Sequence, residues 1–428
     1  MRVVVRRLVE GRLRWALIGW MFVMSAIAFL DRVNLSIAGK ALAREYGLSD
    51  QQLGWVFSAF VLGYALFQAP GGRLADRFGP RRVIALGVVW WGLFTTLTAL
   101  VPVGFALALP LLLVVRFVLG NGEAVVYPSS NRLVASWIPT AERGIANGLI
   151  FAGVGAGSAI TPPLITYIMV HWGWRWSFYA SAVIGLAAGA IWYLIARDAP
   201  REHPWIGKRE LAQIEAGLPV AAGPASGRAA PPWRRIVSNR NVRVVTLAYF
   251  TFGYASYIFF TWFFHYLNEV RGLDLKASTI YSTIAFLAIA VGSPLGGWVA
   301  DVLVGLYGRR VGRCGVAAFG MGLAAIFLAL ATEVKSAPLA SVALAGGAGA
   351  LYLSQSAYWA VTADIAGPWA GFTSGLMNMG GQIGGAVTAS LTPWIAARFG
   401  WSASFLVAAA LAAAGSAAWL LVDPDGRV

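Results

Sequence analysis

Four charged residues lie inside apolar stretches of the chain, where charges are costly. Asp31 and Arg32 interrupt one apolar run, and Arg116 and Glu123 interrupt another. A charge at the centre of a bilayer costs roughly 2.5–3.5 kcal/mol on insertion scales, so each of these residues needs a reason. A carboxylate can carry a proton, and the planar guanidinium of arginine can bind both oxygens of an anionic carboxylate. These residue types favour a substrate or proton site, and the alternative is internal ion pairs that only hold helices together.

The spacing of the second pair indicates a helical face. Arg116 and Glu123 are about two helical turns apart, so they share one side of a helix. Gly120 lies between them on that side, and it removes side-chain bulk where another helix or a ligand approaches. Membrane helices must therefore position the charged residues.

The composition is that of an all-α polytopic membrane protein. Of the 428 residues, 58% are hydrophobic and only 12% are charged, whereas soluble proteins have about 25% charged residues. The net charge of +15 does not indicate nucleic acid as a partner, because Lys and Arg lie in short loops between apolar spans. The single Cys314 excludes an internal disulfide, the three His lack ligand spacing, and no metal or other cofactor is expected.

Hydropathy predicts twelve transmembrane helices in two six-helix halves. Residues 1–197 form the N-terminal half, and residues 244–428 form the C-terminal half. Residues 198–243, charged and then rich in Ala, Pro and Gly, form a cytoplasmic linker with a short surface helix at 207–216. The predicted spans are 15–38, 51–72, 83–102, 105–131, 144–170, 176–196, 244–268, 278–300, 314–331, 338–362, 370–396 and 402–422.

The loops predict the orientation. Most of the 33 Lys and Arg residues lie on the side that holds both termini and the linker. Cytoplasmic loops carry such an excess, so both termini are expected in the cytoplasm.

The two halves also repeat in sequence. G-G-R-L-A-D at 71–76 recurs as G-G-W-V-A-D at 296–301, and G-W-R-W-S-F at 173–178 recurs as G-W-S-A-S-F at 400–405. Gly144 has a counterpart in Gly371 at nearly the same offset. Such a repeat implies halves related by an axis along the membrane normal, with a site between them near the midplane.

The segment G-R-L-A-D-R-F-G-P-R-R at 72–82 resembles the signature loop of the major facilitator superfamily, and with the spans and the repeat this resemblance covers nearly the whole chain. We expect this segment in the loop between the second and third spans, with Asp76 accepting hydrogen bonds from the N-terminus of a facing helix. The resemblance implies that Gly72, Asp76 and Arg77 act in gating rather than in substrate binding.

Two further stretches resemble the anion:cation symporter family within that superfamily, whose bacterial members include galactonate, glucarate and hexuronate transporters and whose animal relatives include sialin. They are F-L-D-R-V-N-L-S-I-A at 29–38, and R-x3-G-x2-E-x4-P with the following W-I-P-T-A-E-R-G at 116–144. The resemblance implies that Asp31 and Glu123 bind the proton. It also implies that Arg32 binds the substrate carboxylate and that Arg116 is the basic partner of the acids.

The seventh span supports the same resemblance with one departure. The family pattern is similar to the stretch F-F-T-W-F-F-H-Y-L at 259–267. In that pattern a Pro and a small residue commonly precede a Tyr, whereas this chain has Phe264 and His265 at these positions. Because of this departure, the resemblance does not predict the structure at the outer end of this helix or the choice of substrate.

Other polar residues within the spans are weaker candidates for substrate binding. A hydroxylated acid needs hydrogen-bond partners, and these side chains provide them; the alternative is packing of helices through polar contacts. The candidates are Tyr64, Tyr254, Tyr257, Gln355 and Asn378.

The function predicted from the sequence is proton-coupled symport of a small organic anion by alternating access. The substrate is expected to be a sugar acid, such as a hexonate, hexarate or hexuronate, or a related carboxylate. We expect a monomer in the inner membrane.

The alternatives are an exporter or drug:proton antiporter of the same fold, and an integral membrane enzyme or sensor. An enzyme is disfavoured because the sequence has no paired-His metal motif and no nucleophile constellation.

Overall fold

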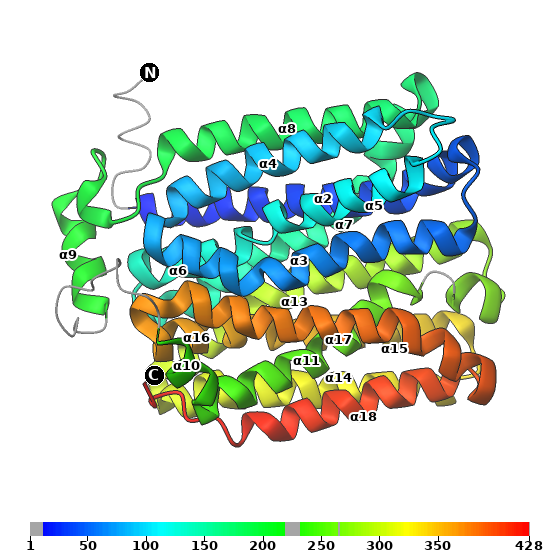
Figure 1. Ribbon diagram of the computed structural model, residues 1–428. Coiled ribbons are helices and arrows are strands. Elements are labelled where there is room, and N and C mark those ends of the chain that lie inside the picture. The colour runs from blue at the N-terminus through cyan, green and yellow to red at the C-terminus, as the bar shows by residue number, and fades with distance from the viewer. Residues whose placement is uncertain (1–11, 219–231, 264–265, 428) are drawn as a thin grey trace.

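A computed structural model describes residues 12–218, 232–263 and 266–427, and the described chain forms a bundle of long helices without strands (Figure 1). The N-terminal part contains α2 (Leu13–Tyr46), α3 (Asp50–Phe78), α4 (Pro80–Leu100), α5 (Ala108–Glu123), α6 (Val126–Trp137), α7 (Arg143–Trp172) and α8 (Trp174–Ile195). The short helices α9 (Lys208–Gly217) and α10 (Trp233–Ser238) follow. The C-terminal part contains α11 (Arg240–Thr261), α13 (Leu275–Tyr307), α14 (Val316–Glu333), α15 (Ala337–Leu353), α16 (Gln355–Ala366), α17 (Ala370–Phe399) and α18 (Trp401–Trp419).

The helices have the length and surface of membrane spans. Ten stretches of the described chain are long and apolar enough to cross a bilayer, and the stretch 337–389 takes in α15, α16 and most of α17. Large apolar side chains such as Leu86 and Val170 point outward and are 70% and 75% exposed. An outer surface of this kind is stable in lipid, because the hydrocarbon solvates it.

The bundle has two parts that meet along their length. In Figure 1, α2 to α8 fill the upper part, and α11, α14, α17 and α18 fill the lower part. Two long contacts join the parts, α7 with α13 and α3 with α17. The C-terminus and the first described residues lie at the same end of the bundle, together with α9 and α10; we call this end the terminal face.

Glycines permit the two parts to touch at the backbone near the terminal face. A Cβ atom on Gly72 of α3 would lie 2.0 Å from the carbonyl oxygen of Gly371 on α17. A Cβ atom on Gly297 of α13 would lie 2.1 Å from the carbonyl oxygen of Gly144 on α7. Any side chain would separate these helices, so the sequence repeat encodes two equivalent close approaches.

The structure corrects the prediction that residues 72–82 form a loop. Helix α3 continues to Phe78, so Gly72, Asp76 and Arg77 are helical. The break is a single residue, Gly79, whose φ of 84° is in the region that favours glycine. Pro80 then begins α4 at a position where its missing N–H is not needed.

Two predicted spans contain breaks. The span predicted at 105–131 divides into α5 and α6 at Ala124, and the span predicted at 338–362 divides into α15 and α16 at Ser354. The N-terminal residues 1–11, the linker segment 219–231, and Phe264 with His265 lie outside the described residues.

Candidate functional site

An ion pair between two helices forms the centre of the candidate site. Arg32 of α2 donates from Nε to Oε1 of Glu123 at the end of α5, at 2.5 Å. The Glu123 side chain is 1% exposed, and the Arg32 side chain is 13% exposed. Glu123 therefore has its direct ionic contact with Arg32 of another helix, and not with Arg116 two turns away on its own helix.

Aromatic rings surround this pair. The Arg32 guanidinium carbon lies 4.1 Å from the ring centroid of Tyr64 and 4.9 Å from that of Phe29. The ring of Phe60 lies close to both arginines, 5.5 Å from Arg32 and 4.9 Å from Arg116. Ring faces attract the cations and exclude water, so charges here interact more strongly than they would in solution.

The second acid and the second arginine lie beside the pair. Both oxygens of Asp31 are 3.2 Å from the Thr95 hydroxyl, which donates to them. Asp31 and Arg116 are 3% and 2% exposed, and neither makes an ion pair within 4 Å among the described residues. Arg116 still attracts both Asp31 and Glu123 electrostatically. Two acids and two arginines thus form one buried, formally neutral cluster.

Several polar atoms of this cluster have no hydrogen-bond partner within the described chain. They are Nη2 of Arg32, Nε and Nη1 of Arg116, and Oε2 of Glu123. A buried polar group without a partner costs about 1–3 kcal/mol, and more when it is charged. The cluster therefore has N–H groups that can donate to an anion, and a carboxylate oxygen that can bind a proton.

The C-terminal part contributes uncharged polar groups. Tyr257 of α11 donates to Oε1 of Gln382 at 2.5 Å, and Gln382 donates to Asn378, one turn away on α17, at 3.4 Å. Asn378 then donates across the two parts of the bundle to Gln68 of α3 at 2.8 Å. Tyr257 and Tyr64 are both within electrostatic range of Arg32. The structure thus brings Tyr64, Tyr257 and Asn378 toward the charged cluster.

Two other sequence candidates have different partners. Gln355 donates to the hydroxyl of Tyr249 at 2.9 Å, in a cluster that also includes Trp359. The backbone carbonyl of Tyr254 accepts from Thr388, and its side chain is 1% exposed. No hydrogen bond or ion pair joins either side chain to Arg32 or Glu123 in the described chain. Gln355 supports helix packing in this arrangement, whereas the hydroxyl of Tyr254 is buried without a hydrogen-bond partner in the described chain.

The structure brings Gln68, Thr95 and Phe60 into the site, and none of these three is predicted as a site residue from the sequence. A signal for Gln68 was present, since it follows Tyr64 by one helical turn in an otherwise apolar span. No comparable signal pointed to Thr95, because threonine is common in membrane helices.

The gating candidates lie at the terminal face. Asp76 accepts from the backbone N–H groups of Gly371 and Phe372, at 3.0 and 2.8 Å, in the first turn of α17. A carboxylate at a helix N-terminus also interacts favourably with the helix dipole. Gly72 makes the close approach to α17 described above. Arg77 is exposed and stacks on Phe78, with no ion pair among the described residues.

The repeat produces a second contact of the same kind. Asp301 at the end of α13 accepts from the N–H groups of Gly144 and Ile145, at 3.0 and 2.6 Å, in the first turn of α7. Arg313 donates to Asp301 at 2.6 Å. Each part of the bundle thus uses an aspartate to hold the first turn of a helix in the other part.

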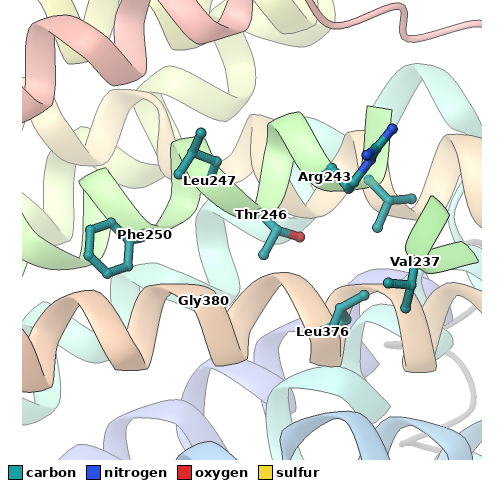
Figure 2. A pocket seen from close by; sticks show the side chains of 8 residues that line it. Val237, Arg243, Thr246, Leu247, Phe250, Leu376 and Gly380 are labelled. Carbon is teal, nitrogen blue, oxygen red and sulfur yellow. The ribbon is translucent and has the colours of Figure 1, made fainter. Parts of the chain in front are cut away.

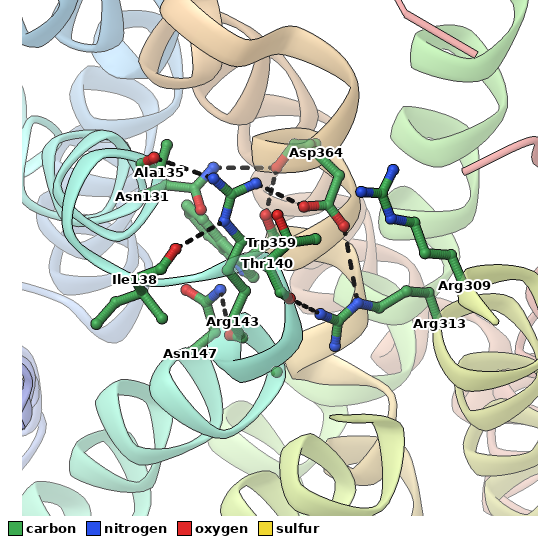
Figure 3. A network of polar contacts seen from close by, with 12 residues as sticks. Asn131, Ala135, Ile138, Thr140, Arg143, Asn147, Arg309, Arg313, Trp359 and Asp364 are labelled. Atoms are coloured by element: carbon green, nitrogen blue, oxygen red, sulfur yellow. Dashed lines mark hydrogen bonds and ion pairs between the residues drawn. The ribbon is translucent and has the colours of Figure 1, made fainter. Parts of the chain in front are cut away.

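Beside Asp301 lies a buried ionic network that crosses between the two parts (Figure 3). Arg143 of α7 donates from Nη1 to Asp364 of α16 at 2.5 Å, and Arg313 lies 3.8 Å from the other carboxylate oxygen. All three side chains are 0–1% exposed. Arg143 also donates to the carbonyl oxygens of Ala135 and Ile138. Together these contacts close the terminal face around α7.

Comparisons with known proteins agree with this architecture. A family model described as Major Facilitator Superfamily matches residues 21–389. A "Probable sulfoacetate transporter" of Cupriavidus necator is 35% identical over 96% of this chain and 94% of its own. The "D-galactonate transporter" of Escherichia coli is 30% identical over 97% and 96%.

The fold has a solved counterpart. The proton:xylose symporter of the major facilitator superfamily superposes with a TM-score of 0.74 at 17% identity, over 94% of this chain and 95% of its own. That identity is too low to carry function, so the likeness shows the fold alone. The family model matches most of the chain, relatives are 30% identical or more, and the fold is a two-part helical bundle. This chain therefore belongs to the Major Facilitator Superfamily and is a membrane transporter, in a superfamily that includes carriers of organic anions.

Proposed function

We propose that the protein is a proton-coupled symporter of a small organic anion. The substrate binds at Arg32, and Glu123 and Asp31 carry the coupled protons. The observation that carries this proposal is the buried Arg32–Glu123 pair, in which each partner keeps one polar atom without a hydrogen bond in the described chain.

The pair suggests how proton and anion depend on each other. An anion that binds Arg32 competes with Glu123 for the same guanidinium. Glu123 would then be a buried carboxylate without its counter-charge, which costs several kcal/mol. A proton on Glu123 removes this cost, and it also frees Arg32 for the substrate. Neither ligand is therefore expected to bind well without the other.

The neutral side of the site supports a hydroxylated monoanion. Tyr257, Gln382, Asn378 and Gln68 offer hydrogen bonds but no charge, opposite the charged residues of the N-terminal part. A hexonate has one carboxylate for Arg32 and several hydroxyls for these groups. A D-galactonate transporter is among the relatives, and so is a probable sulfoacetate transporter, so a small sulfonate is the second candidate.

The two parts of the bundle are proposed to act as the moving units. Residues 1–197 and 244–428 would rock about the central site, with 198–243 as a cytoplasmic linker. The terminal face would be cytoplasmic in an inner membrane, as the distribution of Lys and Arg suggests. A monomer is sufficient for this mechanism, because the site lies within one chain.

Uptake into proteoliposomes tests the proposal. An inward proton gradient should drive accumulation of labelled D-galactonate, or of sulfoacetate if the sulfonate is the substrate. Equal uptake with and without the gradient would exclude proton coupling. No uptake of either compound, with binding of neither in a thermal-shift assay, would exclude the substrate class.

Two substitutions separate binding from coupling. Glu123→Gln mimics the protonated acid, so it should keep substrate binding and substrate-for-substrate exchange but lose proton-driven accumulation. Arg32→Ala should lose binding, because the anion would lie in a low-dielectric site without its counter-charge. Counterflow with preloaded substrate measures exchange, and uptake under a pH gradient measures accumulation.

A matched control is Glu45→Gln. Glu45 also pairs with an arginine, Arg175 at 2.8 Å, but both side chains are about one-third exposed at the opposite end of the bundle. This variant should transport as the unmodified protein does. If Glu123→Gln and Asp31→Asn both still concentrate the substrate fully, the protons bind elsewhere. Normal binding by Arg32→Ala would exclude Arg32 as the anion site.

A further inference from the structure

A groove on the outer surface of the bundle lies away from the charged cluster, between α10, α11 and α17 (Figure 2). Its volume is about 310 Å³, and most of its wall is apolar, with Val237, Leu247, Phe250 and Leu376 among the lining residues. Leu247 is 62% exposed, so this wall faces the surroundings of the protein and not its interior. In a membrane those surroundings are lipid.

The side chains from α11 change in character along the groove. Arg243 lies at the end next to Val237, Thr246 lies in the middle, and Phe250 lies at the other end (Figure 2). Arg243 is exposed and makes no ion pair with any residue that the structure describes. The hydroxyl oxygen of Thr246 is buried and has no hydrogen-bond partner in the described chain, so it does not open onto the groove. From the terminal face inward, the groove has an exposed cation at its mouth and then apolar carbon.

A glycerophospholipid has its groups in the same order. We propose that this groove binds one anionic glycerophospholipid from the leaflet next to the terminal face. Its phosphate lies at Arg243, and one acyl chain lies along Leu247 and Phe250. Arg243 and Leu247 are four residues apart, a rise of about 6 Å, which suits the step from the phosphate to the start of an acyl chain.

The dimensions favour a single acyl chain. At about 30 Å³ for a group the size of a water molecule or a methylene, the groove holds roughly ten such groups, the length of much of one chain. Gly380 forms part of the floor, where a Cβ atom would lie 2.8 Å from Cγ2 of Thr246.

The local charge favours an anionic headgroup over a zwitterionic one. Helix α10 borders the groove and carries Arg234 and Arg235, both exposed, next to the exposed Trp233. Basic residues beside an interfacial tryptophan are typical of a segment that lies at an anionic membrane surface. Arg243 adds its charge at the mouth of the groove. The binding does not depend on which substrate the protein transports.

Native mass spectrometry of the purified full-length protein tests the proposal with phosphatidylglycerol and phosphatidylcholine of identical acyl chains. The unmodified protein should bind one phosphatidylglycerol at least about fivefold more tightly than phosphatidylcholine. Equal affinity for the two lipids would overturn the proposal.

A substitution locates the headgroup. Arg243→Gln should reduce the affinity for phosphatidylglycerol to nearly that for phosphatidylcholine. The matched control is Arg209→Gln, which removes an equally exposed charge from α9. If Arg209→Gln weakens phosphatidylglycerol as much as Arg243→Gln does, general surface charge explains the binding and the site is rejected.

Photo-crosslinking locates the chain independently of charge. Phosphatidylglycerol with a diazirine on one acyl chain should label peptides of α11 and α17 that contain Leu247, Phe250 or Leu376. The labelling should fall at least about fivefold in Arg243→Gln. Labelling confined to other helices would overturn the assignment of this groove.

Discussion

The two aspartate contacts at the terminal face share their backbone geometry but differ in their ionic surroundings. Asp76 holds Gly371 and Phe372 at the start of α17, and Asp301 holds Gly144 and Ile145 at the start of α7. The internal repeat explains why both contacts exist, since glycine and aspartate recur at equivalent positions in the two halves.

The charges around these contacts are not equivalent. Beside Asp301, Arg313 and Arg143 join Asp364 in a network that is almost completely buried. Beside Asp76, the ionic contact is Arg132 at 3.6 Å, and its side chain is 25% exposed. The close approach of the helices is therefore common to both repeats, whereas the buried ionic network lies on only one side of the pseudo-symmetric pair. We therefore expect the Asp301 side to contribute more to closing the terminal face.

The largest effect is expected for Asp364→Asn. This change leaves the buried Arg143 and Arg313 without their shared carboxylate, and breaking a buried pair costs about 3–5 kcal/mol. The closed terminal face should become less stable. A Thr362→Cys reporter on a Cys314→Ser background measures this, because Thr362 is buried where it accepts from Asn131 of the other part.

Labelling of that cysteine by an impermeant maleimide should accelerate at least about tenfold in Asp364→Asn. The matched control is Asp425→Asn, which breaks the exposed pair with Arg309 and should leave the labelling rate unchanged. If Asp364→Asn and Asp425→Asn label at the same rate, the buried network does not lock the face.

The next largest effects are expected for substitution of the two aspartates, Asp76 and Asp301. Asp76→Asn should slow transport but leave substrate affinity within a few-fold, because Asp76 lies far from the central site. Asp301→Asn should slow transport further, since Arg313 also loses a partner, and hydrogen bonds to charged groups contribute about 1.5–3 kcal/mol each. Counterflow rates and equilibrium binding measure the two properties. Equal slowing by both variants would show that Arg313 adds nothing to the contact of Asp301.

The glycine contacts should behave alike on the two sides. Gly72→Ala and Gly297→Ala each place a Cβ atom about 2 Å from a backbone oxygen of the opposing helix. Overpacking of this kind costs about 1–3 kcal/mol, so both variants should slow the step that closes the terminal face. Gly305→Ala on α13 is the control, because its Cβ would meet nothing within 4 Å. A strong effect in only one of the two glycine variants would contradict the shared geometry.

The smallest effect is expected for Arg132→Gln. Its contact with Asp76 is long and partly exposed, and ion pairs of that kind contribute about 0–1 kcal/mol. Transport should therefore change by less than about fivefold in a counterflow assay. Loss of transport as severe as in Asp364→Asn would show that the Asp76 side has an ionic lock of its own.

Some features of the site follow from sequence alone, and others do not. Asp31, Arg32, Arg116 and Glu123 are recognisable as unusual because a charge in an apolar span is visible without any structure. Their pairing is not visible, since the sequence leaves Glu123 facing Arg116 on one helix, whereas the structure places it against Arg32.

The gating segment, residues 72–82, is likewise predictable only in part from the sequence. The aspartate at 76 and its counterpart at 301 are evident from the repeat, and a facing helix N-terminus is a reasonable expectation. The continuation of α3 through this segment was not predicted, because glycines and arginines there resemble a loop. A single left-handed residue, Gly79, is enough to turn the chain.

The membrane class, the helical architecture, the two-fold repeat and the charges within apolar spans are all predictable from the sequence. Hydropathy and glycine spacing are properties of short stretches, and the repeat is found by comparing such stretches, so none of them requires knowledge of how distant helices pack. The pairing of Arg32 with Glu123, the pairing of Asn378 with Gln68, and the sharing of Asp364 by Arg143 and Arg313 are known only from the packed bundle. These contacts depend on the rotation of each helix about its axis and on the closeness that glycines permit between helices, and packing of the whole bundle sets both.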